Sequence, residues 1–121
     1  MVSSAAFEAW AIGWPAGGAI ELHDHGDSAG VVVVAAGTLV ETTVSERGDG
    51  RLETDGAVLE AGSAISFAAT HVHDVANVGI GPAISVHVYA PRLTAMTYYE
   101  ITDGRLEATR TDHFRLGEAI P

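Results

Sequence analysis

Short strand-like segments recur along the whole chain, and glycine or polar turn residues close each of them after a few residues. Their spacing is about 8 to 12 residues, and no helical period lasts longer than a turn or two. The segments predicted as strands are 7–12, 17–22, 31–34, 38–44, 52–54, 57–60, 64–67, 71–78, 83–89, 97–101 and 105–111. Such a chain is predicted to be all-β, as a small antiparallel barrel or jelly roll.

Three local features make the all-β prediction more specific. Residues 30–36 are apolar on both faces, which is typical of a strand buried inside a closed sheet. Asp55-Gly56 is a favourable turn dipeptide, so segments 52–54 and 57–60 are expected to pair as a short hairpin. The polar residues 46–50 are expected to form another tight turn.

Composition limits the partners that the chain could have. Its 121 residues are 47% hydrophobic, which suits a single domain over residues 1–121. Its net charge is −10 and its six basic residues are scattered, so neither nucleic acid nor an anionic membrane is an expected partner. It has no cysteine, which excludes thiolate metal ligands. With no leader-like segment or apolar span of roughly 20 residues, we expect a soluble cytoplasmic protein.

Two histidines, His23 and His25, stand one residue apart in the chain. On an extended chain such a pair points to one side, because side chains alternate with a period of two. Two imidazoles on one side can hold a metal ion, and a metal that also binds substrate usually takes about three protein ligands. The pattern therefore predicts a metal site whose third ligand lies elsewhere in the chain.

Spacing around this pair resembles the signature of the cupin superfamily, G-x5-H-x-H-x3,4-E-x6-G with a later H-x3-N. Gly17, His23, His25 and Gly37 fall on the first part, although Gly30 stands in place of the glutamate. The second part matches His73-Asp-Val-Ala-Asn77. The resemblance implies a double-stranded β-helix with His23, His25 and His73 as metal ligands. His71 is an alternative to His73, because it lies two residues earlier on the same face.

Within the cupins, the chain resembles the cysteine dioxygenase, or thiol dioxygenase, type I family, whose iron site also lacks the glutamate. Segments 22–28, 73–77 and 85–91 are similar to that family from almost one end of the chain to the other. The resemblance implies that Fe(II) binds a small thiol and O2, and that the sulfur is oxidised to a sulfinic acid. Three neutral imidazoles leave the charge of the metal uncompensated, which attracts a thiolate. Zn, Ni or Mn are alternatives.

Ser85, His87 and Tyr89 alternate with apolar residues on one strand, so they share a face. Burying a hydroxyl, an imidazole and a phenol together is costly unless they hydrogen-bond one another. We therefore expect a linked network that aims the Tyr89 hydroxyl at the metal, and the resemblance associates this trio with catalysis. In mammalian members of the family the tyrosine is cross-linked to a cysteine at the position of Gly30, and this chain cannot form that link.

Substrate recognition is where the chain departs from the family. Cysteine dioxygenases carry an arginine for the substrate carboxylate roughly 25 residues before the first histidine of the pair, whereas 22 residues precede His23 here and none is an arginine. Either the natural protein begins earlier, or another residue binds the carboxylate, or the substrate is not cysteine. Arg92 is the suggested substitute for the missing carboxylate-binding arginine. The simpler alternative is that Arg92 is an exposed loop residue without this role. Either Tyr98 or Tyr99, but not both, is expected at the pocket mouth, and His113 is expected to be an ordinary surface residue.

Two other classes of function stay open at this point. The chain could be a non-catalytic or sensing metal-binding cupin, as the missing arginine would permit. It could instead be a cupin enzyme that acts on a carbon substrate with Zn, Ni or Mn. A homodimer formed through edge strands is a further expectation.

Overall fold

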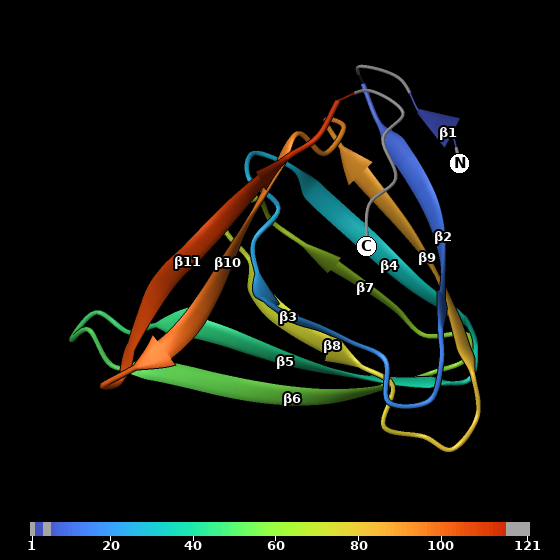
Figure 1. The fold of residues 1–121 in the computed structure, drawn as a ribbon, viewed down its shortest axis with the longest axis horizontal. Helices are drawn as coiled ribbons and strands as arrows, with labels where there is room; N and C mark the ends of the chain where they lie inside the picture. Colours follow the sequence, from blue (N-terminus) through green and yellow to red (C-terminus); the bar gives the residue numbers. More distant parts are fainter. Residues whose placement is uncertain (1, 4–5, 116–121) are drawn as a thin grey trace.

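The computed structural model describes residues 2–3 and 6–115, and the side chains from residue 6 onward. These residues form antiparallel strands without helices (Figure 1). The strands are β1 (Val2–Ser3), β2 (Glu8–Trp14), β3 (Ala19–His23), β4 (Ala29–Ala36), β5 (Thr38–Glu46), β6 (Leu52–Glu60), β7 (Ala64–Phe67), β8 (Val72–Ala76), β9 (Ala83–Ala90), β10 (Ala95–Thr102) and β11 (Arg105–His113). The all-β prediction is confirmed.

Two sheets face each other, and strands distant in sequence alternate within each. One sheet has five strands in the order β1-β2-β9-β4-β7, and the other has six in the order β11-β10-β3-β8-β5-β6. Strand β9 therefore lies between β2 and β4, and β3 lies between β10 and β8 (Figure 1). This interleaving brings the early His-x-His segment beside the late strand that carries His73.

The interior between the sheets contains two apolar clusters. One consists of Trp14, Val34, Leu39, Leu59, Val75 and Ala83. The other consists of Val32, Phe67, Tyr89, Leu93, Met96 and Tyr98. Ile20 and Ile65 pack against both clusters, so the apolar interior is continuous across the barrel.

The prediction that residues 30–36 are buried on both faces is wrong. Val32 and Val34 are 2% and 1% exposed, whereas Val31 and Val33 are 39% and 37% exposed. Strand β4 lies between β9 and β7 in its sheet, but only one side of that sheet faces the interior. The exposed valines thus belong to an outer surface.

The predicted hairpin at Asp55-Gly56 is also wrong. These two residues lie in the middle of β6, where they pair with Thr43 and Thr42 of β5. The long partner strand continues the hydrogen-bonded ladder through the turn-like dipeptide, so tertiary pairing overrides the local preference. The turn expected over residues 46–50 is present, since the amide of Gly50 donates to the carbonyl of Arg47.

Because the described residues contain no helix, none of them forms a helix that could cross a membrane.

Candidate metal centre

Three histidines meet inside the barrel. His23 ends β3 and pairs directly with His73 of β8, while His25 lies two residues beyond the end of β3. One ring nitrogen from each of the three lies within 4.8 Å of the others. The side chains are 3%, 1% and 2% exposed for His23, His25 and His73. The three residues named by the sequence motif are therefore brought together in a closed site.

Asp24 fixes the position of the loop between His23 and His25. One of its carboxylate oxygens accepts hydrogen bonds from the amides of Gly26 and Thr97, at 3.1 and 3.0 Å. The other accepts the Tyr99 hydroxyl at 2.7 Å. His25 thus faces His23 because Asp24 anchors the loop to β10, rather than because the strand continues through both residues. Sequence analysis missed this role of Asp24.

Hydrogen bonds orient two of the three rings. His23 Nδ1 donates to the carbonyl of Glu21 at 2.7 Å, and His73 Nδ1 donates to the Glu41 carboxylate at 2.6 Å. These bonds leave each Nε2 with an available lone pair. His25 Nδ1 is buried and has no hydrogen-bond partner within the described part of the chain.

Burial keeps His23 and His25 neutral. It lowers the pKa of His23 to about 4, with a further contribution from the neighbouring His73. Burial and then the proximity of His23 lower the pKa of His25 to about 2. Both rings are therefore unprotonated at neutral pH and can act as ligands.

This donor set fits a divalent metal ion. Three neutral imidazoles are suited to Fe, Zn, Ni or Cu, and such an ion would satisfy the lone pairs gathered here. Glu41, His71 and His73 form a second group whose ligand atoms also lie within 4.8 Å. There, however, one Glu41 oxygen already contacts both imidazoles, at 2.6 Å from His73 and 3.2 Å from His71. We therefore take His23, His25 and His73 as the candidate ligands.

Glu41 is a site residue that sequence analysis missed. Burial acts to raise its pKa, but hydrogen bonds from His71 and His73 lower it to about 2, so it is a carboxylate. A ligand histidine whose second nitrogen donates to a carboxylate is a common arrangement in metal sites, because it fixes the ring and makes it more basic. The available signal was the alternation of β5, which places Glu41 on the same side as the buried Leu39, and Glu41 is 6% exposed.

Gly30 faces the site from β4. A Cβ atom at this position would lie 2.4 Å from the Phe67 ring and 3.1 Å from the Tyr89 ring. The Phe67 ring stacks on His25 with 4.4 Å between centroids. Phe67 thus occupies the space into which a glutamate at position 30 would extend.

The predicted network on β9 is present. Trp14 Nε1 donates to the Ser85 hydroxyl at 2.8 Å, and Ser85 lies 2.7 Å from His87 Nε2. His87 Nδ1 lies 3.3 Å from the Tyr89 hydroxyl. Since the indole can only donate, Ser85 is oriented to donate to His87, and His87 to donate to Tyr89. The Tyr89 hydroxyl is then left as a donor, and its ring lies 5.3 Å from that of His25.

The electrostatic setting of this network agrees with that orientation. Burial, followed by the effect of His73, lowers the pKa of His87 to about 4, so His87 carries one ring proton at neutral pH. Burial raises the pKa of Tyr89 well above its usual value, so the phenol keeps its proton.

Asn77, the last residue of the second motif, has a structural role. Its side-chain amide donates to the carbonyls of Trp14, Pro15 and Gly81. These bonds fix the ends of β2 and β9 near each other. Asn77 therefore supports the strands that carry the site.

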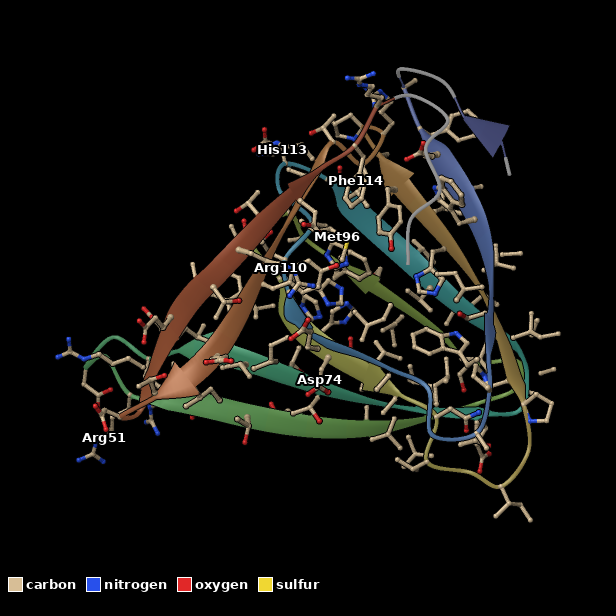
Figure 2. The ribbon with its side chains drawn as sticks, in the orientation of Figure 1. Arg51, Asp74, Met96, Arg110, His113 and Phe114 are labelled. Atoms are coloured by element: carbon tan, nitrogen blue, oxygen red, sulfur yellow. The ribbon has the colours of Figure 1, made fainter. Side chains whose placement is uncertain are left out.

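Two arginines are relevant to substrate binding. Arg92 is half-buried, and its guanidinium makes long contacts of 3.5 Å with the carbonyls of Leu93 and Phe114. Arg110 lies 3.8 Å over the ring of Tyr98. Its side chain is exposed and donates to Glu21 of β3 at 2.9 Å, whereas Arg51 projects outward from the β5–β6 turn (Figure 2).

Tyr98 and Tyr99 face opposite sides of β10, as the alternation predicts. The Tyr98 ring is 6.0 Å from that of His23, while Tyr99 bonds Asp24. Tyr98, Arg110 and Asp112 line a cavity of about 260 Å³. A larger cavity of about 610 Å³ reaches His71. His113 is exposed, as expected.

Solved structures confirm the fold. TT1209 from Thermus thermophilus is 26% identical, with 74% of this chain and 76% of that chain covered and a TM-score of 0.62. A double-stranded β-helix protein from Klebsiella pneumoniae is 22% identical over 75% of this chain and 68% of that one, with a TM-score of 0.63. Oxalate oxidase in complex with glycolate is 20% identical over 71% of this chain and only 42% of its own, with a TM-score of 0.62.

The second and third of these likenesses show the fold alone. No curated protein matches the chain. The family model for cysteine dioxygenase type I matches residues 2–102, which include the three histidines and the Ser85, His87 and Tyr89 network. The chain therefore belongs to the cysteine dioxygenase type I family of cupins.

Proposed function

We propose that this protein is a mononuclear non-haem Fe(II) thiol dioxygenase acting on a small cytoplasmic thiol. The overall reaction is RSH + O2 → RSO2H, in which sulfur is oxidised and both oxygen atoms are retained in the sulfinic acid. One observation carries the proposal: three imidazoles without a carboxylate ligand lie beside a phenol that can donate a hydrogen bond. Iron, when bound, would bring the thiolate and O2 together.

Charge favours an anionic substrate at such a site. As ligands, the imidazoles of His23, His25 and His73 would supply no negative charge, and Gly30 and Phe67 leave no space for the usual cupin glutamate. A thiolate then compensates charge that the protein does not. This charge balance favours thiols over uncharged carbon substrates.

Tyr89 is the proposed catalytic residue, with His87 and Ser85 orienting it. The hydrogen bond from His87 Nδ1 occupies the Tyr89 oxygen and directs its proton toward the histidine cluster. The raised pKa of Tyr89 keeps this proton available at neutral pH. Tyr89 would hydrogen-bond substrate or oxygen rather than act as a base.

Cysteine or a related mercapto acid needs a cation for its carboxylate. Arg92 stays a proposal for this role, although its contacts are with main-chain carbonyls rather than with the site. Arg110 is better placed, because it covers the ring of Tyr98, which neighbours His23. Glu21 already holds Arg110 at 2.9 Å, so a substrate carboxylate would have to compete for it.

The decisive experiment is O2 uptake after anaerobic loading with Fe(II). L-cysteine, 3-mercaptopropionate, cysteamine and mercaptosuccinate are compared, with sulfinate measured as the product. We expect oxidation of at least one thiol, its loss in His73→Ala, and a fall of about 100-fold in Tyr89→Phe. Arg110→Gln should raise KM for mercapto acids but not for cysteamine, with Arg51→Gln as the control.

Parallel loading with Zn, Ni and Mn tests the choice of metal. If iron binds with the three histidines but no thiol is oxidised, the dioxygenase proposal fails. The chain would then be a metal-binding or sensing cupin.

A further inference from the structure

The outer face of the five-stranded sheet is apolar and carries no charge in β2, β4, β7 and β9. Val31, Val33, Val86 and Val88 are between 36% and 39% exposed, and Ile84 is 46% exposed. The other outward positions of these strands are Ala9, Ala11, Gly13, Ala29, Ala35, Ala64, Ser66 and Ala90. We call this set of residues the valine face.

Strand register arranges the valine face in two rows across four strands. One row runs Ala9, Val88, Val31, Ser66, and the next runs Ala11, Val86, Val33, Ala64. The four valines form a central square, and the residues on either side of it are small. A raised apolar centre with low flanks is the shape that a second sheet can meet at a distance of about 10 Å.

This surface is unusual for a chain of this charge. The net charge of the protein is −10. A soluble monomer rarely leaves a large apolar patch uncovered, and such patches commonly mark interaction sites. Two copies of an acidic chain repel each other wherever their charged surfaces meet, but not across a face without charges. The valine face is therefore a surface across which two copies can approach each other without charge repulsion.

We propose that two copies of this protein associate through their valine faces, related by a twofold axis. A twofold contact needs a patch that is complementary to itself, and a square of valines on a sheet meets this condition. β4 and β9 already have partners on both sides, so the contact uses side chains instead of the edge-strand pairing expected from the sequence.

The size of the face sets the expected strength. Four strands spaced about 4.8 Å apart and about five residues of each, at about 3.3 Å per residue, cover roughly 300 Å² in projection. A pair of such faces lies at or below the low end of specific interfaces. The dimer is thus expected to be in equilibrium with monomer at micromolar concentrations or above.

Sedimentation velocity of the full chain, from low micromolar to millimolar concentration, tests the proposal. Val33→Glu places a charge at the centre of the face, twice per dimer, and should weaken association by about 100-fold or more. The matched control is Val58→Glu, which changes a 65% exposed valine on β6 of the other sheet and should leave the dissociation constant unchanged.

A milder variant excludes misfolding as the cause. Val33→Thr combined with Val86→Thr keeps the shape and strand preference of both side chains, and it should weaken the dimer by about 10-fold while thermal melting shows a folded chain. The proposal is overturned if the parent chain stays monomeric up to millimolar concentration. It is equally overturned if Val33→Glu dimerises like the parent, or if Val58→Glu weakens the dimer as much as Val33→Glu.

A spin label locates the contact independently. The chain has no cysteine, so Ser66→Cys introduces a single labelling site at the margin of the valine face. The label at position 66 should report a dipolar distance between two copies that disappears on dilution, whereas a label at Val58→Cys should show a longer one. A shorter distance at position 58 would place the interface on the other sheet and contradict the proposal.

Discussion

The two faces of β9 reverse the usual distribution of polar and apolar residues. Ser85, His87 and Tyr89 point inward and are at most 4% exposed, while Ile84, Val86 and Val88 point outward and are 36% to 46% exposed. The inner side chains are satisfied by one another and by Trp14, and their cost of burial is thereby offset. Within residues 6–115 the outer side chains have no such compensation. The proposed chemistry would explain the polar inner face, and the proposed association would explain the apolar outer face.

The largest expected difference between the inner and outer residues is in how they make the free energy of unfolding depend on pH below neutrality. The folded pKa values of His23, His25 and His87 are about 4, 2 and 4, below the ordinary value of 6.5. The unfolded chain therefore binds protons near pH 6.5 that the folded chain does not take up. Stability is complete above about pH 6.5 and falls below it, by up to about 1.4 kcal/mol per pH unit for each histidine.

Urea unfolding of the metal-free chain between pH 7.5 and pH 4.5 measures this effect. His113→Gln is the control, because His113 is exposed and lies outside the buried histidine cluster. The valine face contributes nothing to the slope, since it holds no titrating group. A free energy of unfolding that stays flat from pH 7 to pH 5 would show that the interior histidines are solvated.

The second effect concerns the hydrogen bond that His73 donates to Glu41 of the neighbouring strand β5, on the inner side of the barrel. Glu41→Ala leaves His73 Nδ1 without its acceptor and should lower metal affinity by about 100-fold, whereas Glu41→Gln keeps an acceptor oxygen and should lower it about 10-fold. Competition with a metal-binding dye measures both variants. Glu60→Gln, at the exposed end of β6, is the control. If the parent chain and all three variants bound the metal with equal affinity, Glu41 would have no role in positioning His73.

Much of the interior could be predicted from sequence because its constraints are local or carried by a motif. The three histidines and the Ser85, His87, Tyr89 network follow from fixed spacing and from alternation within one strand. Glu41 and Asp24 were missed because their partners, His73 and Tyr99, lie far away in the sequence. The prediction that both faces of β4 are buried is wrong, because an apolar segment does not by itself show whether one or both of its faces are covered by the rest of the fold. The hairpin predicted at Asp55-Gly56 does not form, because β6 continues through these two residues while it pairs with β5.

A third test compares two neighbouring residues on opposite faces of β9. Ser85→Ala removes the acceptor of Trp14 Nε1 and the donor to His87, leaving two buried polar groups unpaired. We expect a loss of about 2 kcal/mol in the free energy of unfolding. Val86→Ala, measured at a concentration where the chain is monomeric, should cost under about 1 kcal/mol because its side chain points outward. Similar losses for the two variants would mean that the network contributes little to stability.

The smallest effect concerns two glycines of the same sheet. In Gly30→Ala the new methyl group would meet the Phe67 ring, which must shift within a closed site, and we expect a loss of about 1 kcal/mol. Gly13→Ala on β2 has no atom within 4 Å of the added Cβ and should be neutral or slightly stabilising.

If crowding by Phe67 is the cause, Gly30→Ala should cost less in a Phe67→Leu background than in the parent chain. A double-mutant cycle measured by urea unfolding gives this interaction energy directly. An interaction energy of zero would mean that the added methyl group is accommodated in another way. The fit of Phe67 against Gly30 would then not explain why this site has no place for a fourth, carboxylate ligand.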